Sequence, residues 1–185
     1  DYRLWMLLLL WLPGWALAGS CSVLIVGDSL SSGYGLAAGQ GWVDLLDARM
    51  KKAAPEWRVI NASVSGDTTQ NGLQRLAPAL ARHRPQGVLI ELGGNDALRG
   101  NPPQLIQQNL VAMVREAKAS GAWVLLLEAP VLPNYGKAYA GAVAKLYGEV
   151  ARAERVSHVP CFVCQVGVQP GKMQADGIHP NEQGQ

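Results

Sequence analysis

Short apolar runs alternate with amphipathic stretches along most of this chain. The apolar runs are of strand length, and they span residues 22–26, 57–61, 86–92, 123–128 and, more weakly, 156–163. The amphipathic stretches between them predict helices at residues 42–54, 68–81, 102–121 and 137–153. Strands that are apolar throughout and alternate with helices are typical of a parallel sheet covered on both faces. The pattern therefore predicts an α/β fold.

The apolar run at residues 4–18 stands apart from this alternation. It is too short for a membrane span, and it ends in Ala16-Leu17-Ala18, which places small residues at both positions that precede a signal-peptidase cut. We expect residues 1–18 to be a signal peptide-like segment and residues 19–185 to fold as one domain. The product would be periplasmic or secreted, with no membrane span after removal of the segment. A retained anchor, or lipid attachment at Cys21, is the alternative.

Composition and charge narrow the class of protein. The length of 185 residues suits a single core, and a formal charge of +2 is too small to indicate a nucleic-acid partner. The three cysteines, Cys21, Cys161 and Cys164, fit no disulfide framework and lack the second ligand pair of a structural zinc site. In an oxidising compartment the last two can pair, but we interpret them as packed thiols. We expect no metal and no cofactor.

Two short segments together contain the parts of a serine nucleophile. Ser29 follows the first apolar run in Gly27-Asp28-Ser29-Leu30, and Asp176-Gly177-Ile178-His179 lies near the other end of the chain. A serine hydroxyl needs a base to take its proton, and a histidine base needs a carboxylate to hold its tautomer. An Asp and a His three residues apart can pair through Nδ1 and leave Nε2 for the serine. Pro180, at a natural first helical position, would then hold His179 at a rigid corner.

Two further loops supply donors for an oxyanion. Gly66 lies in the loop after the second run, and Asn95 follows the third run in Gly93-Gly94-Asn95-Asp96. Loops that leave the carboxyl ends of parallel strands line the ligand crevice of such sheets. The N–H groups of Ser29 and Gly66 and the side-chain amide of Asn95 are therefore the expected oxyanion hole. Asp28 and Asp67 more naturally brace these loops by accepting backbone N–H bonds.

The four blocks, in this order, resemble the GDSL-type (SGNH) hydrolases, whose signature residues are matched by Ser29, Gly66, Asn95 and His179. The similarity extends over about residues 23–184 and is greatest to the bacterial thioesterases, lysophospholipases and arylesterases of that family. It implies a three-layer α/β/α flavodoxin-like fold and a small-molecule acyl ester or thioester substrate, including lysophospholipids. In that family a final helix follows the His-Pro-Asn segment, so we expect the domain to be truncated before it.

The resemblance also indicates where the acyl group would lie. Residues 97–102 and 131–136 are expected to wall the acyl site, whereas His83 and His158 are interpreted as surface or structural residues. Residues 159–168 depart most from the family. A carbohydrate acetylesterase with the same constellation is the nearest alternative. A non-catalytic lipid- or glycan-binding module is the alternative from another class, although a binder has no use for a complete nucleophile, base and acid. Nothing in the sequence indicates an oligomeric state.

Overall fold

Five parallel strands form one central sheet. The computed structural model describes residues 21–185, so the predicted signal segment at residues 1–18 lies outside the described residues. The sheet order is β2-β1-β3-β4-β5, which confirms the predicted parallel α/β fold. The strands are β1 (Cys21–Gly27), β2 (Trp57–Asn61), β3 (Gly87–Glu91), β4 (Trp123–Leu127) and β5 (Ser157–Val159). Because β1 has β2 on one side and β3 on the other, the chain reverses its direction of progress across the sheet there, and a crevice opens at such a point.

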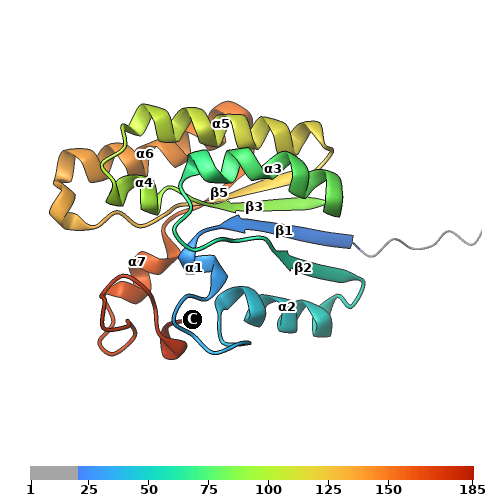
Figure 1. The fold of residues 1–185 in the computed structure, drawn as a ribbon, viewed down its shortest axis with the longest axis horizontal. Coiled ribbons are helices and arrows are strands. Elements are labelled where there is room, and N and C mark those ends of the chain that lie inside the picture. Colours follow the sequence, from blue (N-terminus) through green and yellow to red (C-terminus); the bar gives the residue numbers. More distant parts are fainter. Residues whose placement is uncertain (1–20) are drawn as a thin grey trace, which may run out of the picture.

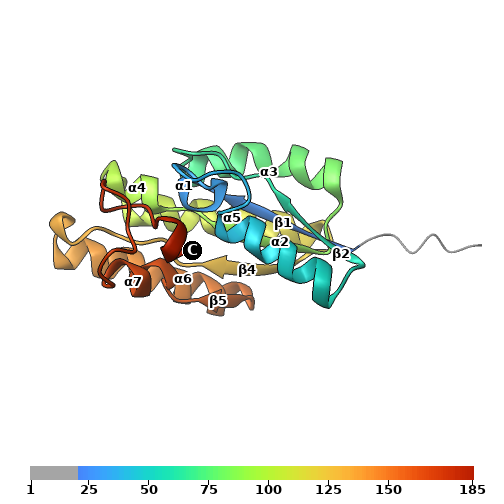
Figure 2. The ribbon, with the colours of Figure 1, turned by 90° about the horizontal axis from the view of Figure 1, so that it is seen from below.

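Helices connect the strands and cover both faces of the sheet. The long helices α3, α5 and α6 pack together on one face, and α2 lies on the other face with α1 and α7 (Figure 1; Figure 2). The α-helices are α1 (Ser29–Ser32), α2 (Trp42–Ala53), α3 (Thr69–His83), α4 (Gly94–Leu98), α5 (Pro103–Ala119), α6 (Lys137–Glu154) and α7 (Phe162–Gly167), with 3-10 turns η1 (Pro133–Tyr135) and η2 (Glu182–Gly184). Within residues 21–185, none of these helices combines the length and the apolar character that a membrane crossing requires.

Alternate residues of each inner strand enter different cores. Leu24 and Val26 of β1 pack into the core beneath α3, α5 and α6, whereas Val23 and Ile25 pack against α2. Side chains alternate between the two faces of a strand, so a strand covered on both sides must be apolar at every position. This burial explains the continuous apolar runs of the sequence.

The structure corrects the prediction for residues 156–163. The strand ends at Val159, and a short helix, α7, begins at Phe162. Pro160 lies between them and has no N–H for the strand ladder, which accounts for the early end. The interpretation of Cys161 and Cys164 as packed thiols was wrong, because the two form a disulfide across the first turn of α7.

The structure also corrects the predicted role of Pro180. This residue is not the first residue of a helix, since it pairs with Met173 in an isolated antiparallel bridge. The Gln174 N–H donates to the His179 carbonyl at 2.8 Å, which closes the turn between the bridge partners. Asn181 then caps η2 by accepting from the Gln183 N–H. The position of His179 is therefore fixed because it lies at the base of a closed turn.

Candidate active site

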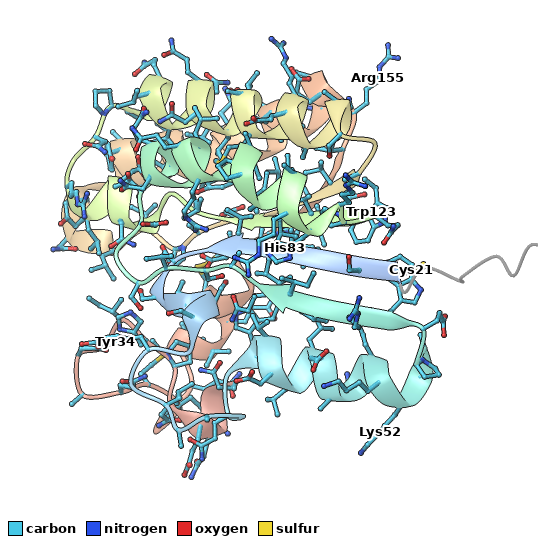
Figure 3. All side chains as sticks on the ribbon, turned by 45° about the vertical axis from the view of Figure 1, so that its right-hand side comes forward. Cys21, Tyr34, Lys52, His83, Trp123 and Arg155 are labelled. Carbon is cyan, nitrogen blue, oxygen red and sulfur yellow. A yellow bond between two sulfur atoms is a disulfide. The ribbon has the colours of Figure 1, made fainter. Side chains whose placement is uncertain are left out.

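Ser29 lies at the point where β1 turns into α1. Asp28 caps this helix, because its Oδ1 accepts a hydrogen bond of 3.0 Å from the Leu30 N–H, as expected for a loop-bracing aspartate. Gly27 is required here, since a Cβ at this position would lie 2.6 Å from Ser31 Oγ. The tight turn leaves Ser29 half-buried at the carboxyl end of the sheet. In Figure 3, Cys21 and Trp123 mark the opposite end of the strands from Tyr34, which follows α1.

A second local turn holds His179. Asp176 Oδ1 accepts from the backbone N–H groups of Ile178 (2.9 Å) and His179 (3.0 Å), and its Oδ2 lies 2.6 Å from His179 Nδ1. Gly177 permits the turn because its φ is +67°. Partial burial raises the pKa of Asp176, but the hydrogen bonds from the His179 ring and from the two N–H groups outweigh it and lower the pKa to about 2. The carboxylate is therefore charged near neutral pH.

The two turns meet as the sequence predicts. His179 Nε2 lies 2.8 Å from Ser29 Oγ, so a continuous hydrogen-bonded chain runs from Asp176 through His179 to Ser29. This is the geometry that lets a histidine accept the proton of a serine hydroxyl.

Tyr34 is a neighbour of the histidine that the sequence does not reveal. Its ring centroid lies 4.8 Å from that of His179, with the planes tilted by 44°. Gln174 Nε2 donates to the carbonyls of both Tyr34 and Pro180, which joins the loop after α1 to the turn that contains His179. The Gly-Tyr-Gly sequence around Tyr34 carries no signal for this contact, because it depends on two segments about 140 residues apart meeting in space.

Asn95 lies beside the nucleophile loop. Its Nδ2 donates to Asp28 Oδ2 at 3.0 Å, and because an amide carries two hydrogens, the second remains for another acceptor. The next residue, Asp96, is fully buried and fixes α4 by accepting from the N–H and hydroxyl of Thr69 and from the Asn101 amide. Asn95 therefore has a defined position, as an oxyanion donor requires.

Gly66 is tied to the loop of Ser29 only indirectly, unlike the other predicted site residues. It lies exposed in the loop before α3, with φ +84°, and a hydrogen bond of 2.7 Å between Ser65 Oγ and Ser32 Oγ ties this loop to α1. Arg99 Nη2 donates to the Gly66 carbonyl at 3.1 Å. Among the described residues, no hydrogen bond joins the Gly66 N–H to Ser29. Its role in an oxyanion hole stays a prediction.

Arg75 of α3 clamps two of the loops together. Its guanidinium donates to the carbonyls of Gly27 and Ala62, the residues that precede the Asp28 turn and the Gly66 loop. Its Nε lies 2.5 Å from Asp67 Oδ2. The expectation that Asp67 braces the loop through backbone N–H groups was therefore wrong, because its carboxylate pairs with Arg75. Sequence alone does not show this clamp, since the helix face that Arg75 occupies is set by the packing of α3.

Two acidic side chains are buried beneath the nucleophile loop. Asp28 is 2% exposed and Glu91, at the end of β3, is 0% exposed. Burial raises the pKa of Asp28 to about 6, although the hydrogen bonds from Leu30 and Asn95 oppose it. Burial, and then the nearby charge of Asp28, raise the pKa of Glu91 well above its usual range. A glutamate inside the apolar run of residues 86–92 is the sequence signal that could have identified this residue.

An apolar cavity of about 360 Å³ opens beside Ser29. The predicted walls contribute Leu98, Val131 and Leu132, and α7 with the turn before His179 closes the other side. The cavity is lined mainly by apolar residues: Leu30, Leu98, Pro130, Val131, Leu132, Val163, Val168, Met173 and Ile178, together with Cys164 and the glycines Gly94, Gly167 and Gly177. Residues from both predicted segments, 97–102 and 131–136, thus line this cavity, and α7 adds a wall that the sequence did not predict. That the cavity holds the acyl group stays a prediction.

The two other histidines lie outside this cavity. His158 Nε2 is 3.3 Å from a carboxylate oxygen of Glu128, and its ring stacks at 6.3 Å on that of the buried Tyr147. His83 is in the last turn of α3, where the helix ends with Arg82 and His83 as its basic residues. The contacts of His158 are structural and His83 lies at the end of a helix, in agreement with the interpretation from the sequence.

Comparisons with known proteins agree with this geometry. Residues 25–185 match the GDSL-like Lipase/Acylhydrolase family. The chain is 50% identical over 163 residues to the Esterase TesA of Pseudomonas aeruginosa, a match that covers 88% of this chain and 81% of that one. It is 42% identical over 183 residues to an Arylesterase of Vibrio mimicus, covering 99% and 92% of the two chains.

A third relative and a solved structure extend the likeness. The chain is 42% identical over 168 residues to the Thioesterase 1/protease 1/lysophospholipase L1 of Escherichia coli K12, covering 91% of this chain and 79% of that one. The crystal structure of TesA superposes with a TM-score of 0.84 at 50% identity, over 88% of this chain and 90% of that chain. The three-layer arrangement seen here is thus the fold of that relative.

Proposed function

Because this chain belongs to the GDSL-like lipase/acylhydrolase family, we propose that it is a serine hydrolase of acyl thioesters and carboxylic esters, with Ser29 as its nucleophile. The observation that carries the proposal is the hydrogen-bonded chain from Asp176 through His179 to Ser29. The relatives named esterase, arylesterase and thioesterase support the same class of reaction.

The reaction we propose has two half-reactions. Ser29 Oγ attacks the acyl carbonyl carbon while His179 Nε2 takes the hydroxyl proton, and the resulting tetrahedral oxyanion is held by the Ser29 N–H, the Gly66 N–H and the second hydrogen of the Asn95 amide. His179 then gives its proton to the departing alcohol or thiol, which leaves an acyl group on Ser29. A water molecule repeats the attack with His179 as base, and the released carboxylic acid restores Ser29. Asp176 stabilises the histidine cation in both halves.

The cavity supports a substrate with a hydrocarbon acyl chain. A site of about 360 Å³ lined by Leu, Val, Pro and Met side chains is much larger than an acetyl group and offers it few polar partners. We propose medium or long acyl esters and thioesters, including lysophospholipids, as the substrates. We also propose that the protein acts in the periplasm or outside the cell. The disulfide between Cys161 and Cys164 supports this, because such bonds persist in oxidising compartments.

A panel of p-nitrophenyl esters and acyl-CoA thioesters of graded chain length tests the proposal. We expect hydrolysis to increase from acetyl to longer chains and to be lost in Ser29→Ala, while Ser157→Ala, which removes an exposed hydroxyl in β5, stays within about threefold of the parent. Activity confined to acetyl esters would instead indicate a carbohydrate acetylesterase. A protein that binds these compounds without hydrolysing any of them would contradict the proposal and indicate a binding module.

A further inference from the structure

Asp28 and Glu91 face each other at the ends of two paired strands. Gly27 of β1 is in register with Glu91 of β3, so the residue after Gly27 begins its turn directly beside the glutamate. Both side chains are almost completely buried, with exposures of 2% and 0%. Two ionised carboxylates at such a site would repel each other and would both lose their hydration. One of the two groups must therefore be neutral.

The hydrogen bonds differ between the two carboxyl groups. Asp28 accepts from the Leu30 N–H through Oδ1 and from the Asn95 amide through Oδ2, so both oxygens have a donor. Glu91 Oε2 accepts from the Ser31 hydroxyl at 2.7 Å, but Oε1 accepts from no residue within the described part of the chain. A buried carboxylate oxygen without a donor is costly, whereas a protonated carboxyl oxygen is itself a donor. The proton therefore fits on Glu91.

The electrostatic environment favours the same assignment. Burial raises the pKa of both groups, and the charge of Asp28 and a side-chain hydrogen bond with Asp28 raise the pKa of Glu91 further. Hydrogen bonds from the Ser31 hydroxyl and the Asp28 N–H lower the pKa of Glu91, but the raising causes outweigh them. The pKa of Asp28, about 6, is held down by its two N–H donors. At neutral pH Asp28 is thus the carboxylate and Glu91 the acid.

We propose that Glu91 is a positioning residue for the oxyanion site: its protonated carboxyl donates to the Asp28 carboxylate, which in turn holds the Asn95 amide and the first turn of α1. The inference rests on the proposed function, in which Asn95 is an oxyanion donor. Glu91 touches no substrate and acts only through Asp28. The shared proton removes one negative charge beneath the nucleophile loop, where a second carboxylate would oppose the developing oxyanion.

Other ionisable groups act on this pair from the surrounding elements. His179, when protonated, lowers the pKa of Asp28, and Asp67 in the loop before α3 raises it. Tyr147 of α6 donates its hydroxyl to the Leu92 carbonyl, and its own pKa is raised well above the usual range, first by burial and then by the charge of Glu91. Arg75 of α3 donates to the Gly27 carbonyl. None of these groups supplies a donor to Glu91 Oε1.

Paired substitutions at Glu91 test whether its donor is what matters. Glu91→Gln can keep an oxygen toward Ser31 and an N–H toward Asp28, so we expect kcat within about threefold of the parent. Glu91→Leu has a similar size but no donor, and we expect kcat to fall by about 10- to 100-fold with KM almost unchanged, a part of the effect of losing one oxyanion donor. Equal kcat values for the two variants, both folded by their thermal midpoints, would overturn the proposal.

The pH dependence of kcat also tests the proposal, because a purely structural role of Glu91 would leave it unchanged. When Glu91 ionises at high pH, the carboxylate pair repels and kcat should fall. Ser31→Ala removes a hydroxyl that stabilises the Glu91 carboxylate, so it should raise the pKa of Glu91 and move this alkaline fall to higher pH. Glu91→Gln should abolish the fall. An alkaline fall that persists in Glu91→Gln, or that moves to lower pH in Ser31→Ala, would contradict the inference.

An infrared measurement separates this inference from the proposed function. The carbonyl stretch of a protonated carboxylic acid should be present in the parent at neutral pH and absent from Glu91→Gln, whatever the enzyme hydrolyses. If that band is absent from the difference spectrum between the parent and the variant, Glu91 is not protonated at neutral pH and the inference is wrong. If the band is present but the parent hydrolyses no ester, the proposed function fails while the protonation of Glu91 stands. The infrared test does not use Glu91→Leu, so it remains valid if that variant fails to fold.

Discussion

His179 Nε2 lies 2.8 Å from the Ser29 hydroxyl, although 150 residues separate the two in the sequence. Each partner is held by its own short turn. Asp28 caps the turn at Ser29, and Asp176 accepts the two backbone N–H groups that close the turn at His179. The sheet and the segment before η2 need only to bring these two preformed turns together. Because each turn is held by its own hydrogen bonds, the contribution of each turn can be measured separately.

The first prediction concerns Asp176, which we propose orients the histidine. In Asp176→Asn the side-chain oxygen can still accept from Ile178 and His179, so the turn persists, but the amide N–H faces Nδ1. The histidine must then carry its proton on Nε2, where it cannot accept one from Ser29, and kcat should fall by about 10²- to 10⁴-fold with little change in KM. Steady-state kinetics on one ester substrate measures this. The control is Asp47→Asn, which removes a surface carboxylate paired with Lys51. A variant at Asp176 as active as the control would remove Asp176 from the triad.

The second prediction tests the oxyanion role of Gly66 against a matched glycine. Gly66 and Gly121 have φ values of +84° and +90°, and a Cβ at either would meet no atom within 4 Å. Alanine at both positions should therefore cost a similar stability, about 1 kcal/mol, through backbone strain alone. Only Gly66→Ala should also lower kcat, because a shift of its backbone moves an N–H of the proposed oxyanion hole. Equal kcat values for the two variants would show that Gly66 is not part of the oxyanion hole.

The fold and the triad could be predicted because their signals are local. Strand β2 and the start of α2 lie where the apolar pattern places them, at Trp57–Asn61 and at Trp42. The pair Asp176 and His179 lies within one turn, so their spacing alone indicates their contact. Parallel strands then bring the loops at their carboxyl ends to one edge, which places Ser29 and Asn95 together.

The parts that the sequence did not reveal depend on contacts across the fold. The clamp made by Arg75 needs the face of α3 to be known, and the pair of Asp28 and Glu91 needs the register of β1 with β3. The helix α7 is missed because a strand and a helix of three to six residues have almost the same apolar pattern. The disulfide between Cys161 and Cys164 spans the first turn of this helix.

The third prediction follows from the place of that disulfide in the cavity wall. Val163 and Cys164 line the cavity, whereas Ser29 and His179 are held by turns elsewhere. Reduction, or the double change Cys161→Ser and Cys164→Ser, should loosen α7 and raise KM for long acyl esters several-fold, with acetyl esters hardly affected. Cys21→Ser serves as the control, since Cys21 is unpaired and begins β1 at the other end of the sheet. Equal changes of KM for long and short esters would show that α7 does not contact the acyl chain.

The last prediction concerns stability and pH, because two aspartates at the site have pKa values displaced in opposite directions. The pKa of Asp176 is about 2 in the folded protein against a usual 3.8, so the folded state loses this proton more easily than the unfolded chain. The contribution of Asp176 to the free energy of unfolding is therefore present above pH 4 and is lost as the pH falls toward 2. The pKa of Asp28 is about 6, so between pH 4 and 6 the folded state keeps a proton that the unfolded chain releases. Stability from this group falls as the pH rises through that window.

Denaturant unfolding from pH 2 to 7 separates the two effects. The advantage of the parent over Asp28→Asn in free energy of unfolding should shrink from pH 4 to 6, by on the order of 1–3 kcal/mol, since Asp28 is buried and a pKa displacement of one unit corresponds to about 1.4 kcal/mol. The advantage over Asp176→Asn should instead grow from pH 2 to 4 and then level off; its size is reduced by solvent, because the Asp176 side chain is 36% exposed. An advantage over Asp28→Asn that stays constant from pH 4 to 6 would mean that Asp28 is ionised throughout. The hydrogen bonds from Leu30 and Asn95 to the Asp28 carboxylate would then outweigh the cost of burying its charge.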